Sequence, residues 1–211
     1  MQSIFTSSYL PPVQFMSHWV NTDEPIIEAH CNYAKQTYRN RCDILGANGP
    51  ISLIVPVIKG RRPKVASKDV EIAYYERWQD LHWRSILSAY KSSPFFEYYM
   101  DDFAVFYEKQ YKFLLDFNNE LMQVILDALD INKDLKFTEK FDRVLADDIL
   151  DYRESIHPKK DYSQLDLNFK PIKYRQVFSD RYEFIPNLSV IDLIFNKGPE
   201  AIDLLEDSIL K

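Results

Sequence analysis

Apolar and polar positions alternate along much of the first third of the chain, whereas apolar positions recur every three to four residues after about Tyr75. Alternation is typical of a strand with one buried face, and the longer period is typical of an amphipathic helix. The pattern therefore predicts an α+β fold: an N-terminal mixed β-sheet with a covering helix in residues 1–75, followed by a mainly helical C-terminal part in residues 76–211.

Several segments of the first part have the pattern of strands. The stretches "PIIEAHC" from Pro25 and "KDVEIAY" from Lys68 alternate as strands do. The stretch "YLPPVQFMSHWV" contains two prolines, which suit an extended segment from which a helix starts. The stretches "RNRCDIL" and "ISLIVPV" are separated by "ANGP", in which Asn48 and Gly49 both tolerate positive φ. We expect these two stretches to form a β-hairpin.

Helical spacing is most regular in the middle of the chain. The stretch "YERWQDLHWRSILSAY" predicts a helix that ends at the following Ser-Ser-Pro sequence. Residues 101–130 predict one long helix or two in sequence, with Asp101 or Asp102 as the N-cap.

The C-terminal part has weaker signals, except at its end. A short helix is expected after Thr138, and "YRQVFSDRYEFIP" is expected to form a strand and a loop. Two final helices are expected on either side of Gly198 and Pro199, since glycine commonly ends a helix and proline suits the first turn of the next.

The composition fits one globular domain over residues 1–211. Hydrophobic residues make up 46% of the chain and charged residues 27%, which supplies enough apolar material for a packed core. Four glycines are too few for glycine-rich phosphate-binding loops. The N-terminus lacks the pattern of a signal peptide, and the apolar runs are too short to span a bilayer. The sequence therefore predicts a cytoplasmic protein without a membrane span.

Basic residues are concentrated in one segment of an otherwise acidic chain. Residues 33–68 contain eight bases and one acid, a charge of +7, while the remainder contains 18 bases and 31 acids, a charge of −13. This distribution favours a compact anionic ligand held in one place over a nucleic acid. For residues 61–68, a solubilising basic loop is the simpler interpretation.

Two arginines in this segment suggest an anion site. If a strand begins near Arg39, alternation places Arg39, Arg41 and Asp43 on one face and Cys42 and Ile44 toward the core. Two arginines spaced in this way form a paired fork that suits phosphate or carboxylate oxygens. The alternative is that Asp43 neutralises Arg41 on an exposed strand.

No established catalytic motif is present, and the histidines and cysteines lack metal-ligand spacing. The sequence therefore predicts no metal site and assigns no cofactor. Cys31 and Cys42 are expected to be reduced, buried thiols. His82 is expected to act as a general base if it faces a pocket. The alternative is a half-buried helix histidine between Trp78 and Ile86.

Three blocks of the chain resemble, in their order and spacing, the WbqC-like family of bacteria. The blocks are "YLPPVQFM", "QTYRNRCDILGANGPISLIVPV" and "NLSVIDLIFNKGPEA", with "SAYKSSPFFEYY" between the second and the third. The matching positions are Tyr9, Pro11, Pro12, Gln14, Phe15, Arg39, Asn40, Arg41, Asn48, Gly49, Pro56, Val57, Tyr90, Pro94 and Phe95. The form of the first two blocks looks like the version found in Bacteroidetes.

The resemblance implies a role in surface-polysaccharide or O-antigen synthesis, as a transferase of an acyl or aminoacyl group, such as glycine, to an amino sugar. The chain departs from the family in two ways. Its proline segment lacks the full aromatic version, and its C-terminal half lacks the glycine-containing segment of many members. Both departures bear on the identity of the substrate more than on the fold.

The residues and the resemblance together point to one site, for a small anionic or phosphate-bearing substrate. The resemblance disfavours nucleic acid as a partner, except for an aminoacyl-tRNA end. The expected ligand-binding residues are Tyr9, Lys35, Tyr38, Arg39, Asn40, Arg41 and Lys59, and the expected catalytic residues are His82 as base and Tyr90 as proton donor. Two alternatives stay open: a non-catalytic module that binds an anionic glycan precursor or a partner protein, and arginines that form internal ion pairs. Convergence of Arg39, Arg41, His82 and Tyr90 on one cleft would favour the enzyme. The sequence assigns no oligomeric state.

Overall fold

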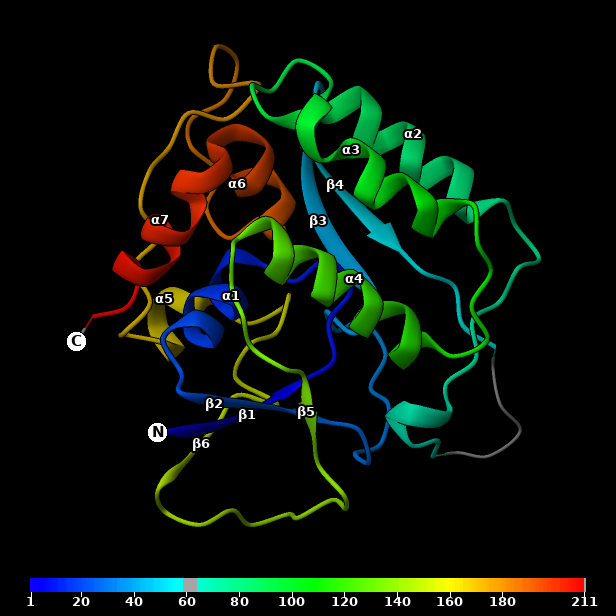
Figure 1. Ribbon diagram of the computed structural model, residues 1–211, viewed down its shortest axis with the longest axis vertical. Helices are drawn as coiled ribbons and strands as arrows, with labels where there is room; N and C mark the ends of the chain where they lie inside the picture. Colours follow the sequence, from blue (N-terminus) through cyan, green and yellow to red (C-terminus); the bar gives the residue numbers. More distant parts are fainter. Residues whose placement is uncertain (59–63, 211) are drawn as a thin grey trace.

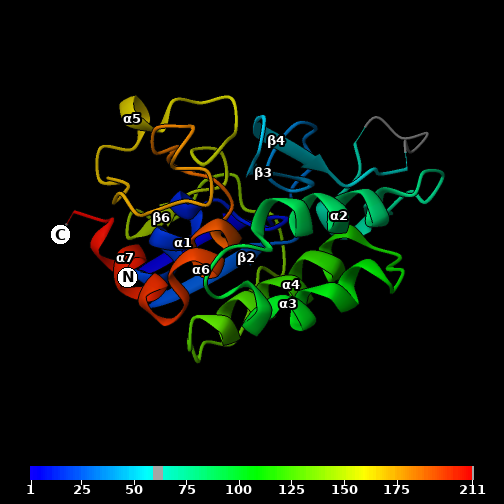
Figure 2. The same ribbon diagram turned by 90° about the horizontal axis from the view of Figure 1, so that it is seen from above.

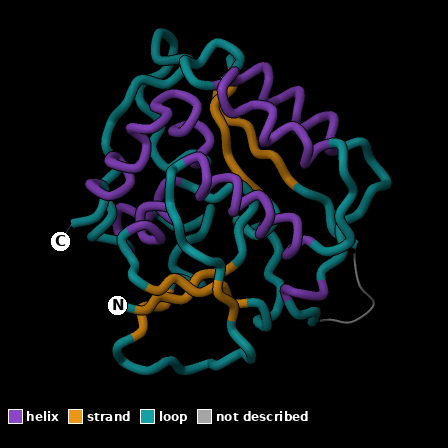
Figure 3. Tube along the Cα trace, viewed as in Figure 1, coloured by secondary structure: helices purple, strands orange, loops and turns teal. Residues whose placement is uncertain are grey.

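A computed structural model of the protein describes residues 1–58 and 64–210 (Figure 1). Strands occur in two separate places, a small sheet near the N-terminus and a hairpin that is not part of it (Figure 3). Lys59, one of the expected ligand-binding residues, lies outside the described residues.

The first sheet has four strands, and all of its neighbouring pairs are parallel. In spatial order the strands are β5 (Lys136–Phe137), β2 (Glu24–Glu28), β1 (Gln2–Thr6) and β6 (Ile149–Asp151). The connection from β1 to β2 runs through helix α1 (Val13–Val20), as a parallel pair requires. The expected strand from Pro25 and the expected helix after the two prolines are therefore confirmed.

The hairpin consists of the antiparallel strands β3 (Arg41–Gly46) and β4 (Gly49–Ile54), which confirms the predicted hairpin. Ala47 and Asn48 form the loop between them, and Gly49 adopts a φ of 107°. Only a glycine adopts this φ without strain. Cys42 and Ile44 are fully buried, which confirms the face that alternation predicted for them.

Helices and loops make up the remaining structure, and the arrangement of the helices follows from their contacts (Figures 1 and 2). Besides α1, the described helices are α2 (Trp78–Tyr90), α3 (Phe96–Ala104), α4 (Leu114–Ala128), α5 (Tyr162–Leu165), α6 (Val190–Lys197) and α7 (Ala201–Asp207), with 3₁₀ turns at η1 (Ser67–Asp69), η2 (Val105–Tyr107) and η3 (Gly198–Glu200). Helix α2 packs on β3, α3 packs on α4, and α1 packs on α6 and α7. The break at Gly198 and Pro199 confirms the predicted pair of final helices.

Aromatic side chains fill the core in which these elements meet. Phe5 of β1 packs against Phe15 and Trp19 of α1, with ring centroids 4.9 and 5.2 Å apart. On the other side of the core, Trp78 of α2 packs against Phe117 of α4, with ring centroids 5.7 Å apart. Each buried aromatic ring removes a large apolar area from water, so these contacts fix how the helices lie on the sheet and on the hairpin.

The predicted α+β class is confirmed, with one difference in the sheet. The parallel strands and the antiparallel hairpin form two sheets, and both edge strands of the first sheet come from the part predicted to be mainly helical. Strands β5 and β6 contain only two and three residues. Segments this short are too brief for alternation to reveal them.

Four local predictions were wrong. Residues 139–148, expected to include a short helix, contain none, and exposed side chains such as Val144 (85% exposed) have no surface to pack against. Asp101 and Asp102 lie inside α3 and do not cap a helix. The segment from Lys68 forms η1 and then only isolated bridges, such as that between Ile72 and Val57.

The strand expected within residues 174–186 is also absent. The side chain of the buried Gln176 forms both backbone hydrogen bonds of Ile185. It donates to the carbonyl oxygen of Ile185 at 2.9 Å and accepts from its N–H at 3.0 Å. A side-chain amide thereby takes the place of a neighbouring strand.

Candidate functional site

The two central arginines both approach the segment that follows β6. Arg41 is the first residue of β3, and Arg39 precedes the strand. Nη2 of Arg39 lies 3.9 Å from Oε1 of Glu154, while Arg41 lines a cavity together with residues of the same segment, Pro158 among them. The two side chains therefore reach the segment 153–162 at different points.

The cavity beside Arg41, here named the hairpin groove, has a volume of about 350 Å³. Its walls come from the hairpin, from the segment around α5 and from the segment before α6. Its lining residues are Tyr38, Arg41, Asp43, Pro50, Ser52, Pro158, Lys160, Asp161, Tyr162, Ile185, Pro186, Asn187 and Leu188. This volume lies in the range of small-molecule sites.

Arg41 and Asp43 form an ion pair in this groove. Nε and Nη2 of Arg41 donate to Oδ1 of Asp43 at 3.1 and 3.0 Å, and the hydroxyl of Ser52 donates to the same oxygen. The side chains of Arg41 and Asp43 are 27% and 21% exposed, so solvent and solutes reach both. Nη1 of Arg41 has no hydrogen-bond acceptor among the described residues, which leaves one edge of the guanidinium for a ligand.

The other polar residues of the groove are held by the fold. Asp161 precedes α5 and accepts from the backbone N–H of Ser163 at 3.0 Å. Asn187 has a φ of 56°, and its side-chain oxygen accepts from the N–H of Gln14 in the first turn of α1 at 2.9 Å. This bond satisfies one of the N–H groups that a helix leaves without a partner at its start. Burial raises the pKa of Tyr38, so its hydroxyl stays protonated.

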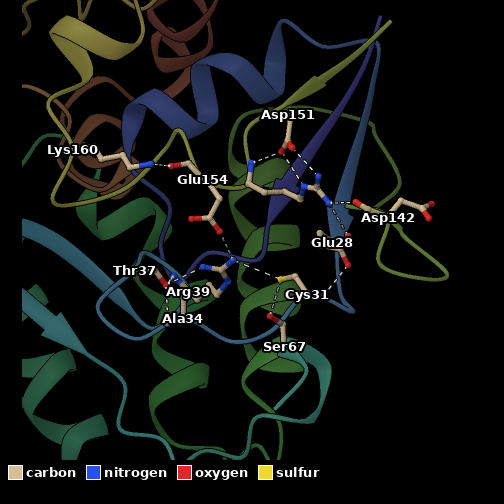
Figure 4. A network of polar contacts seen from close by, with 11 residues as sticks. Glu28, Cys31, Ala34, Thr37, Arg39, Ser67, Asp142, Asp151, Glu154 and Lys160 are labelled. Atoms are coloured by element: carbon tan, nitrogen blue, oxygen red, sulfur yellow. Dashed lines mark hydrogen bonds and ion pairs between the residues drawn. The ribbon is translucent and has the colours of Figure 1, made fainter. Parts of the chain in front are cut away.

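Arg39 lies deeper, near the carboxyl ends of the parallel strands (Figure 4). Its side chain is 4% exposed and donates to the hydroxyl of Thr37 at 3.3 Å and to the sulfur of Cys31 at 3.6 Å. Its Nε has no hydrogen-bond acceptor among the described residues. The buried guanidinium is thus held by long contacts, and its nearest described carboxylate, that of Glu154, is largely exposed.

A second buried arginine, Arg153, is paired much more closely. Arg153 donates to both carboxylate oxygens of Asp151, at 2.9 and 2.7 Å, and its Nη1 lies 3.5 Å from the fully buried Glu28. Oε1 of Glu28 also accepts from the N–H groups of His30 and Cys31 at 2.7 and 3.0 Å. These contacts fasten the end of β2 to the end of β6.

His82 lies outside the hairpin groove. Its Nδ1 is 2.9 Å from the hydroxyl of Tyr9, which in turn is 3.0 Å from the hydroxyl of Tyr107. Burial lowers the pKa of His82 to about 4, so the ring is neutral at pH 7. The ring borders a different cavity of about 380 Å³, between β4 and the start of α2, where Trp78 and Leu81 also lie.

Tyr90 lies at the end of α2 and is completely buried. Its pKa is raised by burial and then by the charge of Asp192. The carboxylate of Asp192 accepts from the hydroxyl of Tyr174 at 2.7 Å and from the side chain of Gln176 at 3.2 Å. Burial raises the pKa of Asp192 to about 6 despite these bonds.

The structure therefore brings only part of the expected ligand set together. Tyr38 and Arg41 line the hairpin groove. Tyr9 is buried against His82, Asn40 is buried and donates to the carbonyl oxygen of Val55 at 2.9 Å, and Lys35 is exposed.

Sequence reasoning did not find the groove residues that lie far along the chain from the hairpin. They are Lys160, Asp161, Tyr162 and Asn187. The one local signal was a helix start at Asp161, whose side chain caps α5. Nothing in the spacing of these residues connects them to Arg41.

Three further observations concern the chemistry that the chain offers. Cys31 and Cys42 are free and buried, and burial raises the pKa of the Cys42 thiol well above its ordinary value. Among the described residues, no three His, Cys, Asp or Glu side chains are grouped so that they would hold a metal ion. The described helices are also too short or too polar to cross a lipid bilayer.

Comparison with known proteins gives two matches. A sequence model of the WbqC-like protein family matches residues 6–204. The chain is also 28% identical, over 96% of its length and 96% of the length of the relative, to a protein of Mycobacterium tuberculosis described as "Uncharacterized protein Rv1507c". No solved structure is significantly similar to the chain.

Proposed function

Because the chain belongs to the WbqC-like protein family, we propose that it binds an anionic amino sugar in the hairpin groove as a step in surface-polysaccharide synthesis. The observation that carries this proposal is the position of Arg41, partly exposed in a 350 Å³ cavity with one edge of its guanidinium unoccupied by described residues. A planar guanidinium in such a site suits a phosphate or carboxylate group.

The charges of the groove support this class of ligand. Arg41 and Lys160 supply positive charge, and Asp43 and Asp161 supply negative charge in the same cavity. The cations suit an acidic substituent on the sugar, whereas the carboxylates suit its ammonium and hydroxyl groups. A ligand with only one sign of charge would be repelled by the two groups of the same sign.

The apolar part of the groove also suits a sugar ring. Tyr38 and Tyr162 line the cavity along with Pro50, Pro158 and Pro186. Aromatic and proline faces pack on the C–H faces of a ring while the polar groups around them bind its hydroxyls. The Tyr38 hydroxyl is protonated and available to donate, because burial raises its pKa.

A second candidate function is transfer of an acyl or aminoacyl group to the amine of the bound sugar. In that reaction the amine nitrogen forms an amide bond, the ester or thioester bond of the donor breaks, and the amine proton passes to a base and then to the leaving group. The carboxylates of Asp43 and Asp161 favour this candidate, since they lie in the cavity of Arg41. His82 is a weaker choice because it is buried and borders a different cavity.

Calorimetric titration tests the binding proposal with glucosamine 6-phosphate, glucose 6-phosphate and glucosamine as probes. We expect Arg41→Gln to weaken binding of the two phosphates on the order of 10- to 100-fold, the effect of losing a charge-assisted contact. Asp43→Asn keeps the contact with Arg41 and is expected to weaken binding only of the probes that carry an amine. Arg84→Gln changes an exposed arginine of α2 away from the groove and serves as the matched control.

Equal affinity of the wild type and Arg41→Gln for every probe would overturn the binding proposal. The transfer candidate needs a separate assay, the release of free thiol from an acyl coenzyme A thioester in the presence of glucosamine 6-phosphate. If the sugar binds at the groove and no thiol is released with any thioester tested, the non-catalytic module is the better description.

A further inference from the structure

A second polar cavity is lined by segments that do not line the hairpin groove. We name it the α6 pocket; its volume is about 320 Å³ and its lining residues are Ser92, Ser93, Pro94, Arg175, Gln176, Val177, Asn196 and Lys197. It forms where the turn between α2 and α3 meets the end of α6 and the segment 175–177. In Figure 1 these segments meet at the top of the molecule.

The charge of this pocket differs from that of the hairpin groove. Arg175 and Lys197 line it, and no acidic residue is among its lining residues. Arg175 is exposed and forms no ion pair with a carboxylate of the described residues. Lys197 is 31% exposed and lies 2.6 Å from Glu200, whose side chain is 69% exposed. An ion pair this exposed contributes little stabilising free energy, so Lys197 can leave Glu200 to bind an anionic ligand.

The floor of the pocket is polar, buried and already hydrogen-bonded. Ser93, Gln176 and Asn196 are 7%, 2% and 9% exposed. The hydroxyl of Ser93 donates to the carbonyl of Tyr90 at 2.7 Å, and the side chain of Asn196 donates to the carbonyl of Asp192 at 2.7 Å. A ligand therefore meets a floor that does not have to reorganise when it binds.

We propose that the α6 pocket binds the phosphate group of a phosphorylated small molecule. The fork of Arg175 and the ammonium of Lys197 neutralise the charge, as such groups do in other phosphate sites, and the hydroxyl of Ser92 supplies a further donor. The volume exceeds that of a phosphate group alone, so the organic part of the molecule also fits. This site is separate from the hairpin groove, and it does not depend on the function proposed there.

Nuclear magnetic resonance titration tests the site directly. Inorganic phosphate and glycerol 3-phosphate are the probes, and the backbone amides of Ser93 and Lys197 and the side-chain amide of Asn196 are the reporters. We expect saturable shifts at these reporters in the wild type, with an affinity that falls as salt is added. The double variant Arg175→Gln with Lys197→Gln is expected to bind at least about tenfold more weakly.

Two control variants separate this site from other basic surfaces. Lys173→Gln removes an exposed charge two positions from Arg175 that does not line the pocket, and it is expected to bind as the wild type does. Arg41→Gln weakens phosphate binding in the hairpin groove, so shifts at Ser93, Lys197 and Asn196 that persist in this variant come from the α6 pocket. Absence of saturable shifts, or shifts that disappear in Arg41→Gln and persist in the double variant, would overturn the proposal.

An experiment with lipid vesicles tests whether the phosphate group belongs to a small molecule or to a lipid. Sedimentation with vesicles of phosphatidylcholine that contain phosphatidic acid is compared with titration by glycerol 3-phosphate. Binding of glycerol 3-phosphate that depends on Arg175 supports a small molecule as the ligand. Binding that occurs only on the acidic vesicles contradicts it.

Discussion

The hydroxyl of Tyr9 lies 2.9 Å from Nδ1 of His82, and this hydrogen bond joins two residues that are 73 positions apart. Tyr9 follows β1, and His82 lies in the second turn of α2. The bond therefore holds the helix against the segment that leads into α1. Since both side chains are buried, the pair is best understood as a fixed point of the core.

Acidification is expected to weaken the fold through His82. The pKa of His82 is about 4 in the folded protein and 6.5 ordinarily, because burial disfavours the charged ring. The unfolded chain binds the proton first, so the free energy of unfolding falls by about 3 kcal/mol as pH drops from 6.5 to 4. Urea unfolding of the wild type and His82→Gln between pH 7 and pH 4 measures this. A variant that loses as much stability as the wild type would contradict the prediction.

Asp192 is expected to act in the opposite direction. Burial raises its pKa to about 6 from 3.8, so its contribution is fully present below pH 3.8 and is lost as pH rises through 6. The loss amounts to about 3 kcal/mol. Asp192→Asn keeps the acceptor for Tyr174 and cannot ionise, so it is expected to be more stable than the wild type at pH 7 and not at pH 3.5. The control is Asp203→Asn, on the exposed face of α7, which is expected to change little.

Gly198→Ala is expected to destabilise the protein by at least about 2 kcal/mol. Gly198 has a φ of 55°, and a β-carbon built there would lie 2.5 Å from the ring of Phe95. The backbone conformation and the ring therefore both oppose a side chain. Denaturant unfolding measures the loss. The double variant with Phe95→Leu is expected to be destabilised by less than the sum of the two single changes, and additive effects would show that the ring contact is unimportant.

Breaking the buried pair of Glu28 and Arg153 is expected to be costly. Arg153→Met leaves the fully buried carboxylate of Glu28 without a cation, and such a change commonly costs about 3–5 kcal/mol. Glu28→Gln leaves the guanidinium of Arg153 paired with Asp151, so it is expected to cost less, about 1–3 kcal/mol. If the two residues stabilise each other, the double variant loses less than the sum of the two single losses in a double-mutant cycle. Strict additivity would show that the pair does not interact.

Elements with a strong local signal were predictable from the sequence. The hairpin follows from alternation on either side of Gly49, and α2 and α6 follow from apolar residues at helical spacing. Strands β5 and β6 were not predictable, because two or three residues carry no period and gain their bonds only from β2 and β1.

Some residues of the candidate site were likewise predictable from local sequence, and others were not. Arg41 and Tyr38 were found because they lie in one dense basic segment, and the inward direction of Cys42 followed from alternation. Alternation did not extend to Arg39, since β3 begins only at Arg41 and the backbone before it turns. Lys160 and Asn187 reach the groove through tertiary packing, which no local pattern records.

The arrangement of the parallel sheet has a consequence for synthesis of the chain. Strand β1 is made well before one of its two neighbours, β6, which ends only at Asp151. During translation, that edge of β1 has no partner until residues 149–151 have left the ribosome. Contacts between residues far apart in sequence form slowly. The hairpin and α2, whose contacts are more local, are therefore expected to form before the sheet is complete.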